Sequence, residues 1–234
     1  MSGRRLLAGL LVLLAGGFVL PAVAGNDQEA KLAEVVEVLR ELEAIPEQAI
    51  PPALLADARA VVIIPSVIKV GLVVGGRYGK GVVSLRRGDG TWGAPLFLSL
   101  SLKGGSVGWQ IGAQATDVIL VFKTLQSVNG MLEGKFTLGA DAAVAAGPIG
   151  RQASASTDAQ LKAEIYSYSR SRGLFAGISL DGAVLGIEHG DNAACYHHPG
   201  VVPEAVLGLA PQAQPEAARR LTARLRALSG ESER

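Results

Sequence analysis

The sequence predicts an α+β fold: a strongly curved, mostly antiparallel β-sheet, sandwich- or barrel-like, with an N-terminal helix and short flanking helices. Apolar residues first recur with helical spacing and then, beyond residue 60, alternate with a period of two. The strand-like segments follow one another without long helices between them, which favours an antiparallel meander over a doubly wound sheet. The 30 glycines are interspersed with Val, Leu and Ile, as expected for bulges and bends in a curved sheet.

The N-terminal helix is predicted over Asn26–Ile45, where one face is apolar and the other is acidic. The apolar positions are Leu32, Val35, Val36, Leu39 and Leu42. We expect this helix to dock on the core, because helices that lie on membrane surfaces usually carry Lys and Arg on the polar face. The pair Pro51-Pro52 predicts the start of a second, short helix, since proline is tolerated in a first helical turn.

The central part of the chain predicts a series of strands with turn signals between them. The segments with strand character are Ala60–Ile64, Val70–Arg87, Ala94–Leu102, Ser106–Gln114 and Asp117–Phe122. Asp89-Gly90 is a strong turn signal between the second and third of these. A short helix is expected over Thr124–Gly134, and an extended pattern resumes over Phe136–Gly147.

The stretch YSYSRSRGLFAGISLDG, Tyr166–Gly182, predicts two strands folded around a turn at Gly173. Before the turn, tyrosines alternate with serines. After it, the residues expected on one face of a single strand are Leu174, Ala176, Ile178 and Leu180. We interpret the serines as small polar positions of a pleated strand, and neither as nucleophiles nor as a phosphate cradle.

The first 24 residues are typical of a secretory signal peptide. Arg4 and Arg5 precede the apolar segment Leu6–Leu20, and Ala22-Val23-Ala24 forms a small-x-small cleavage site. The alternative is a retained membrane anchor, but a spanning helix needs about 20 apolar residues. The sequence therefore predicts an exported protein of the periplasm or cell envelope.

The remainder is divided into a domain, residues 25–200, and a C-terminal tail, residues 201–234. In the tail, Leu221, Leu225 and Leu228 share one helical face and arginines occupy the rest. This pattern predicts a short basic amphipathic helix, which would either rest on the domain or touch a membrane.

Two motifs suggest chemistry, but neither has the context that its chemistry needs. Ser106 stands in a G-x-S-x-G sequence, which serves hydrolases only on a strand-to-helix turn, and the residues after it alternate like a strand. Cys195, His197 and His198 are too few for a metal centre of three or four ligands. We therefore predict no enzyme, cofactor or metal site, and a serine hydrolase using Ser106 remains a remote alternative.

The charges are balanced overall, with 22 Lys and Arg against 21 Asp and Glu, so bulk charge predicts no nucleic-acid partner. Their distribution is uneven. Between Arg59 and Lys123 there are eight basic residues, opposed only by Asp89 and Asp117. Such an excess on one face can attract an anionic partner.

Several blocks together resemble the SYLF-domain family, known for a yeast actin-patch protein. In order they are IPPALLADARAVVIIPSVIKVG, GGRYGKGVV, GTWGAPLF, GGSVGWQIGAQATDVILVF, GKFTLGADAAVAAGPIGR and YSYSRSRGLFAGISLDG. The resemblance runs from about Ile50 to Tyr196. It implies a lipid-binding module, because eukaryotic members bind phosphoinositides and bacterial members are typically exported envelope proteins. Some members bind actin. We expect actin binding to be unlikely for this chain, which shows no appended SH3 or FYVE-like segment.

The resemblance and the uneven charge together predict a partner, an anionic phospholipid or membrane surface, bound through a basic sheet face. The candidate lipid-binding residues are Lys69, Arg77, Lys80, Arg86, Arg87, Lys103, Arg170 and Arg172. The alternative is a structural or protein-interaction module of the envelope that does not bind lipid directly.

Overall fold

A computed structural model of the chain describes residues 26–44, 50–70, 76–103, 115–148, 163–171 and 174–230. Five of the sequence-based predictions lie outside these residues: the signal peptide 1–24, the strand Ser106–Gln114, the serine Ser106, the candidate Arg172 and the turn residue Gly173.

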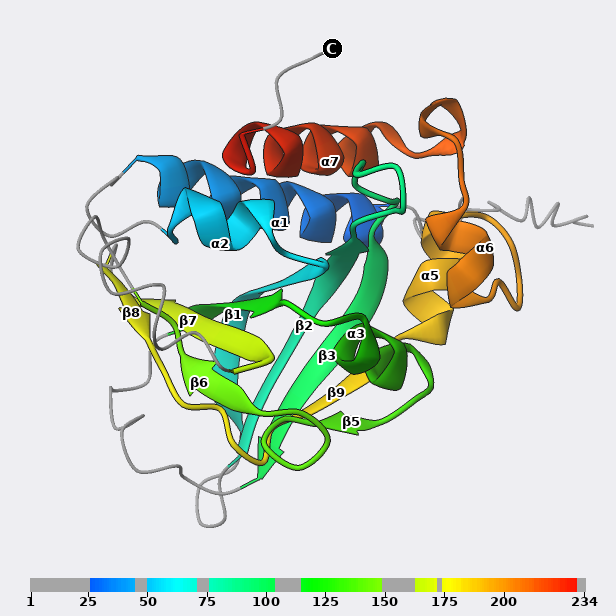
Figure 1. Cartoon of the computed structure of the whole chain (residues 1–234). Coiled ribbons are helices and arrows are strands. Elements are labelled where there is room, and N and C mark those ends of the chain that lie inside the picture. Colours follow the sequence, from blue (N-terminus) through cyan, green and yellow to red (C-terminus); the bar gives the residue numbers. More distant parts are fainter. Residues whose placement is uncertain are drawn as a thin grey trace, which may run out of the picture.

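The described helices and strands alternate in short runs (Figure 1). The helices are α1 (Asn26–Glu43), α2 (Pro52–Ala56), α3 (Leu125–Leu132), α5 (His189–Cys195), α6 (Pro203–Leu207), the 3-10 turn η2 (Pro211–Ala213) and α7 (Glu216–Leu228). The strands are β1 (Ala60–Val70), β2 (Gly76–Leu85), β3 (Leu96–Lys103), β4 (Thr116–Phe122), β5 (Phe136–Thr137), β6 (Val144–Ala146), β7 (Ile165–Ser171), β8 (Leu174–Gly177) and β9 (Val184–Ile187).

The strands form one sheet in the order β5-β9-β3-β2-β1-β4-β7-β6, with β8 paired to β7. The pairings of the named strands are antiparallel except for β6 with β7. Figure 1 shows the sheet strongly curled into a half-barrel, with α1, α2 and α7 together on one side. The predicted fold class is confirmed.

The apolar residues of the sheet pack on both of its faces. One face, with Val61, Ile63, Val82 and Phe97, forms a cluster with α1, α2 and α7. The other face packs against a second cluster that includes residues of α3, β5 and β9. Because β1 and β4 are covered on both sides, they read in the sequence as nearly continuous apolar runs.

Both terminal helices pack on this core and against each other. The predicted apolar face of α1 is buried, as Leu32, Leu39 and Leu42 show, so its expected docking is confirmed. In α7, Leu221 and Leu225 are buried in the same cluster. The helix predicted in the tail therefore rests on the domain.

A bulge in β1 accounts for some of the glycines within the strands. Its register with β2 shifts between Ile63 and Ile68, and Ser66 adopts a positive φ of 53°. A Cβ on Gly81 would overlap the carbonyl oxygen of Ile63. The close approach of β2 to the bulged strand thus requires glycine, as the sequence predicted.

Some of the predicted boundaries differ from the structure. Strand β1 continues through the bulge to Val70, beyond the predicted end at Ile64. The extended pattern over Phe136–Gly147 is two short strands, because Thr137 and Asp141 close a turn between them with a 2.6 Å hydrogen bond from amide N to carboxylate Oδ2. The predictions also missed α5 and α6, which are too short for helical periodicity to be visible.

The predicted hairpin is confirmed for the pairing of β7 with β8, but the prediction that the second strand continues to Leu180 is wrong. Ser171 of β7 pairs with Leu174 of β8 in the antiparallel sense. Strand β8 ends at Gly177, and the next residue, Ile178, accepts through its carbonyl oxygen from the Ser167 hydroxyl of β7. The expected single face therefore breaks: Leu174 is exposed, whereas Leu180 is buried.

Candidate functional site

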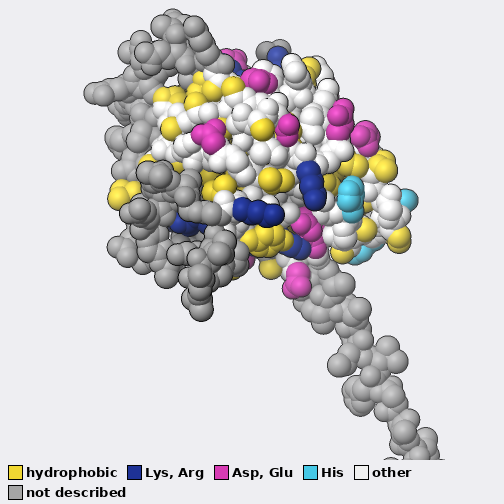
Figure 2. All heavy atoms as spheres, turned by 90° about the horizontal axis from the view of Figure 1, so that it is seen from below, with side chains coloured by type: hydrophobic (Ala, Val, Ile, Leu, Met, Phe, Trp, Pro, Cys, Tyr) yellow, Lys and Arg dark blue, Asp and Glu magenta, His cyan; other side chains and the backbone are white. Residues whose placement is uncertain are grey.

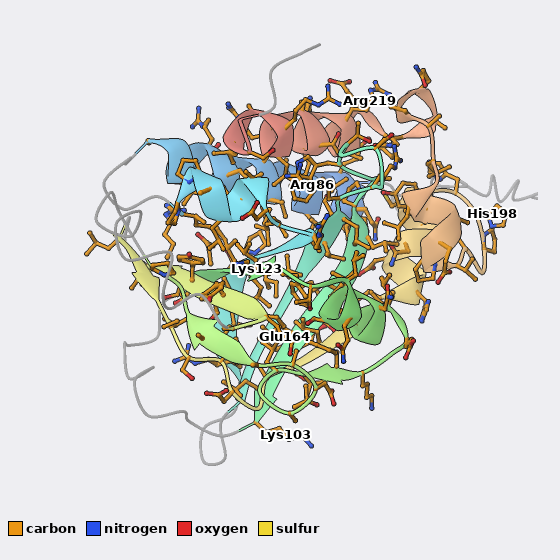
Figure 3. The ribbon with its side chains drawn as sticks, in the orientation of Figure 1. Arg86, Lys103, Lys123, Glu164, His198 and Arg219 are labelled. Carbon is orange, nitrogen blue, oxygen red and sulfur yellow. The ribbon has the colours of Figure 1, made fainter. Side chains whose placement is uncertain are left out.

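The candidate lipid-binding residues lie at several places on the sheet. Three of them meet where β1, β2 and β3 end: Lys69 pairs with Arg77, and Lys103 pairs with Gly76 beside it. Figure 3 shows Lys103 at this end and Arg86 at the opposite end, beneath the helices. The structure thus brings together Lys69, Arg77 and Lys103 and separates them from Arg86.

Arg86 and Arg87 hold the connection between β2 and β3 in place. The Arg86 guanidinium donates to the carbonyl oxygens of Leu55, Ala58 and Gly90 at 3.0–3.2 Å and stacks over the ring of Trp92. Arg87 donates to the carbonyls of Leu207 and Leu209, at 2.7–3.0 Å. These contacts give both arginines a structural role, and lipid binding by them stays a prediction.

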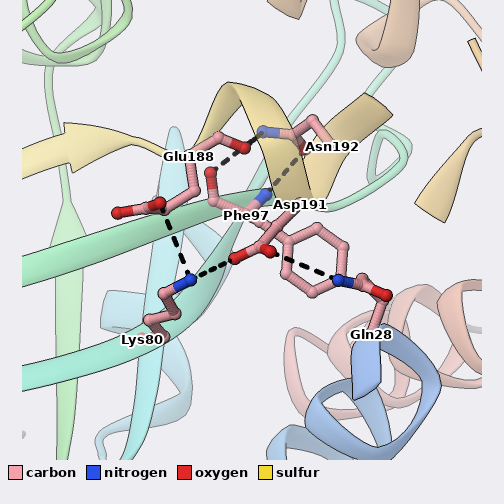
Figure 4. Close-up of polar contacts among 6 residues, drawn as sticks. All are labelled: Gln28, Lys80, Phe97, Glu188, Asp191 and Asn192. Atoms are coloured by element: carbon pink, nitrogen blue, oxygen red, sulfur yellow. Dashed lines mark hydrogen bonds and ion pairs between the residues drawn. The ribbon is translucent and has the colours of Figure 1, made fainter. Parts of the chain in front are cut away.

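Lys80 joins three elements through a polar cluster (Figure 4). Its ammonium lies 2.8 Å from the carboxylate of Asp191 and 3.7 Å from that of Glu188, both near the start of α5. Gln28 of α1 donates to the other oxygen of Asp191 at 3.2 Å. The hydrogen bond to Asp191 raises the pKa of Lys80, which therefore stays charged. The cluster ties α1 and α5 to β2.

The same helix α5 is fixed to the sheet by Asn192, which is buried. Its side-chain oxygen accepts from the Phe97 amide at 2.9 Å, and its side-chain nitrogen donates to the Phe97 carbonyl at 3.0 Å. Asn192 thereby satisfies both backbone groups of one residue of β3, as a neighbouring strand would.

Arg170 links β7 to β4 and α1. Its guanidinium contacts the carboxylates of Glu41 and Asp117, the latter at 2.9 Å. Asp117 also accepts from the amide of Ser66, at the bulge of β1, at 2.9 Å. Burial raises the pKa of Asp117. Arg170 is thus held within the fold, and its binding of lipid stays a prediction.

The end of the sheet also displays two large side chains that sequence reasoning did not single out. Ile68 is 49% exposed and Tyr78 is 36% exposed. They are partners across β1 and β2, and cross-strand partners project from the same face of a sheet. Strand register places Lys103 on this face and Arg77 on the opposite one.

We call this group, Ile68, Lys69, Arg77, Tyr78 and Lys103, the sheet tip. Figure 2 views the molecule from this end and shows hydrophobic side chains beside Lys and Arg, with some Asp and Glu between them. Lys103 is exposed, and burial lowers the pKa of Arg77. The sheet tip therefore combines exposed apolar surface with positive charge.

The thiol and imidazoles considered for a metal centre do not come together. Cys195 is buried in α5, and this burial raises the pKa of its thiol to about 12. His197 and His198 follow at the surface, and Figure 3 shows His198 at the edge of the molecule. Within the described part of the chain, no group of three or more His, Cys, Asp or Glu side chains is placed to hold a metal ion.

None of the described helices has the length and apolar character needed to cross a bilayer.

Comparison with known proteins identifies relatives among binding and regulatory proteins. Residues 103–228 match the sequence model of the family Ysc84, described as Las17-binding protein actin regulator. An SH3 domain-containing protein of Schizosaccharomyces pombe is 40% identical over 154 residues, covering 64% of this chain and 35% of the relative. LAS seventeen-binding protein 3 of Saccharomyces cerevisiae is 39% identical over 142 residues, covering 59% of this chain and 30% of the relative.

The human SH3 domain-containing YSC84-like protein 1 is 36% identical over 171 residues, which make up 70% of this chain and 48% of the relative. The chain thus spans from about a third to about half of the length of these relatives. The family match extends over more than half of the chain and includes β4, α3, α5 and α7. The chain belongs to the Ysc84 family, the SYLF-domain family that the sequence blocks indicated.

Proposed function

We propose that this protein is a non-enzymatic module that binds anionic membrane surfaces through its sheet tip. The observation that supports this most is the pair of exposed side chains, Ile68 and Tyr78, on the same face as the exposed Lys103. An apolar group with neighbouring cations is the composition that suits the boundary between lipid headgroups and acyl chains.

The described side chains of the sheet tip have different parts in this proposal. Tyr78 has an apolar ring and a polar hydroxyl, so it can lie at the boundary with its hydroxyl in water. Arg77 and Lys103 would each contribute about 1 kcal/mol near an anionic surface. The formal net charge of the whole chain is only +1, so the proposal relies on a local group of charges and not on the net charge.

Charge reversal at Lys103 tests the electrostatic part. We expect Lys103→Glu to weaken binding to vesicles of phosphatidylcholine and phosphatidylglycerol by on the order of tenfold or more, since about 1 kcal/mol of attraction becomes repulsion. The measurement is flotation of the purified protein at low salt. Arg59→Glu is the matched control, because Arg59 is also exposed but lies at the opposite end of β1.

Two outcomes would contradict the proposal. One is equal recovery of the wild type with anionic vesicles and with vesicles of phosphatidylcholine alone. The other is equal weakening by Lys103→Glu and Arg59→Glu, which would show that net charge matters and the position does not.

A second candidate function is a protein-interaction module, in line with the names of the relatives. One relative is named for binding LAS seventeen, and the family is described as an actin regulator. This chain spans only part of such relatives, so these partners are candidates here. Co-sedimentation with actin filaments tests the candidate directly, and binding to actin without any vesicle binding would favour it over the lipid function.

We also propose that the protein is exported to the periplasm or cell envelope, which rests on the sequence of residues 1–24. Intact mass measurement of the protein from its native cells tests this. A mature chain that starts at Gly25 would support export, and a chain that keeps Arg4 and Arg5 would contradict cleavage.

A further inference from the structure

A cavity of about 370 Å³ lies between the connection from β2 to β3 and the C-terminal segment that holds η2 and α7. Figure 3 shows Arg219, which lines it, on α7 and far from Lys103 at the sheet tip. The buried Trp92 also lines the cavity, and its indole N–H donates to the Ser229 hydroxyl at 3.3 Å. The cavity is therefore separate from the proposed membrane-binding site.

Three arginines from two parts of the chain line this cavity: Arg87, Arg219 and Arg226. The Nε and Nη2 atoms of Arg87 are fixed by the Leu207 and Leu209 carbonyls, which sets the plane of its guanidinium. Arg219 uses Nη1 to donate to the Gln214 carbonyl at 2.7 Å. Within the described residues, the guanidinium group of Arg226 has no hydrogen-bond or ion-pair partner, although its backbone carbonyl accepts from the Ser229 hydroxyl at 3.1 Å. The lining thus offers several guanidinium donors, which suit carboxylate and phosphate oxygens.

The lining also includes Gln214, whose side chain has a buried oxygen acceptor that lacks a donor. Gln214 is only 4% exposed, and its side-chain nitrogen donates to the Leu209 carbonyl at 3.0 Å. The other atom of this amide, Oε1, is buried and has no hydrogen-bond partner in the described part of the chain. The bond to Leu209 fixes which end of the amide is the nitrogen. A buried acceptor of this kind calls for a donor from outside.

Asp89 adds a second acceptor at the mouth. Its Oδ1 accepts from the amide and the hydroxyl of Thr91, at 2.9 and 2.7 Å. These hydrogen bonds lower the pKa of Asp89, and the nearby charge of Arg87 lowers it further. Its carboxylate is therefore ionised at neutral pH and can only accept hydrogen bonds.

We infer that this cavity binds a small hydroxylated oxyanion, either a hydroxy-carboxylate or the phosphate ester of a small polyol. The anionic group would lie against the guanidinium groups of Arg87, Arg219 and Arg226, and a hydroxyl would donate to Oε1 of Gln214. The volume is at the lower end of the range for small-molecule sites, which is roughly 300–1,000 Å³. The wall of Trp92 would cover the carbon skeleton.

Tryptophan fluorescence tests this inference, because Trp92 lies in the wall of the cavity. The chain has two tryptophans, so Trp109→Phe leaves Trp92 as the reporter. We expect saturable changes with sn-glycerol 3-phosphate or D-glycerate, and at least tenfold weaker binding of sulfate, which has no hydroxyl donor at neutral pH. Neutral glycerol should give no saturable change.

Variants of α7 locate the binding. Arg226→Ala should raise the dissociation constant of the better probe at least tenfold. Arg220→Ala is the matched control, since Arg220 lies on the same helix but is exposed and paired with Glu216 at 2.9 Å. Thermal unfolding of both variants must match the wild type, as expected for arginines without buried contacts. If Arg226→Ala unfolds early, Arg226→Lys, which keeps the long stem, is measured instead.

The inference is overturned if neither probe gives a saturable change, or if Arg226→Ala and Arg220→Ala bind equally well. It is also overturned if sulfate binds as tightly as the hydroxylated probes, which would indicate an adventitious anion contact. Phosphatidylglycerol vesicles form the last arm. If the fluorescence of Trp92 changes with these vesicles but not with the soluble probes, the cavity belongs to the membrane function. That result would contradict a small-molecule site.

Discussion

Gly147 lies against the ring of Tyr168, a residue that is fully buried in β7. A Cβ at this position would overlap the ring atoms, and the Tyr168 hydroxyl is fixed by its hydrogen bond of 3.1 Å to the Pro148 carbonyl. The ring therefore has no room to move aside. This contact explains why the residue directly after β6 is a glycine.

The contact predicts that Gly147→Ala destabilises the fold. We expect a loss of about 1–3 kcal/mol in the free energy of unfolding, the usual range for an overpacked core. Urea denaturation measures it. Gly190→Ala is the control, because a Cβ on Gly190 of α5 meets no atom within 4 Å, and alanine is the better helix former. An equal effect of the two substitutions would contradict this explanation.

At the residue scale, the sequence predicted whether a residue lies in a strand better than it predicted the hydrogen-bond and ion-pair partners of that residue. The alternation of tyrosine and serine in β7 indicated a pleated strand, and Tyr166, Ser167 and Tyr168 are indeed buried within the sheet. The partners of Arg87 and Arg170 could not be predicted, because they come from α6, α1 and β4, far away in the sequence.

The N-terminus of α3 shows how a single element is fixed to the sheet. The Thr124 hydroxyl accepts from the Ser127 amide at 3.2 Å and caps the helix. Glu164, which precedes β7, accepts from the hydroxyls of Ser127 at 2.5 Å and Thr124 at 3.1 Å (Figure 3). These hydrogen bonds lower the pKa of Glu164, and the bond from Ser127 has the larger effect.

This arrangement predicts a pH-dependent contribution to stability. Because the pKa of Glu164 is lower in the folded state, its contribution is fully present above the ordinary carboxyl pKa and is lost as the pH falls through the folded value. Glu164→Gln should remove this dependence. The measurement is the midpoint of urea unfolding as a function of pH, with Glu133→Gln as the control on the exposed end of α3. A parallel pH dependence in wild type and Glu164→Gln would contradict this role.

At the element scale, long periodic segments could be predicted and short ones could not. The apolar stripe of α1 and the alternation in β2 and β3 extend over enough residues to show their period. By contrast, α5 has seven residues and α6 has five, and α5 is positioned by Asn192 and Asp191 through tertiary contacts. The residue after β8, Ile178, is likewise positioned by a tertiary contact, with Ser167 of β7.

At the scale of the whole molecule, the sheet has two structurally different ends. The end beneath α1 and α7 is closed by packed helices and contains the cavity lined by Arg219. The other end is the sheet tip, with Ile68, Tyr78 and Lys103. The sequence indicated the excess of positive charge, but only the strand register shows which cations meet and that Ile68 and Tyr78 lie beside them.

The orientation of the protein on a membrane is therefore the central claim, and Cys195 makes it directly measurable. This lone cysteine is buried, and its thiol, with a pKa raised to about 12, stays protonated and unreactive. A cysteine introduced at the surface can thus be labelled selectively with an environment-sensitive fluorophore. The two positions to compare are Tyr78→Cys at the sheet tip and Arg59→Cys, which lies about 30 Å away along β1, at roughly 3.3 Å per residue.

The decisive measurement is the emission of these two labelled proteins with vesicles that contain phosphatidylglycerol. We predict a blue shift for the label at position 78, because it enters the apolar boundary of the bilayer, and no shift for the label at position 59. A shift at position 59 alone, or none at position 78 when the protein floats with the vesicles, would show that the sheet tip does not face the membrane.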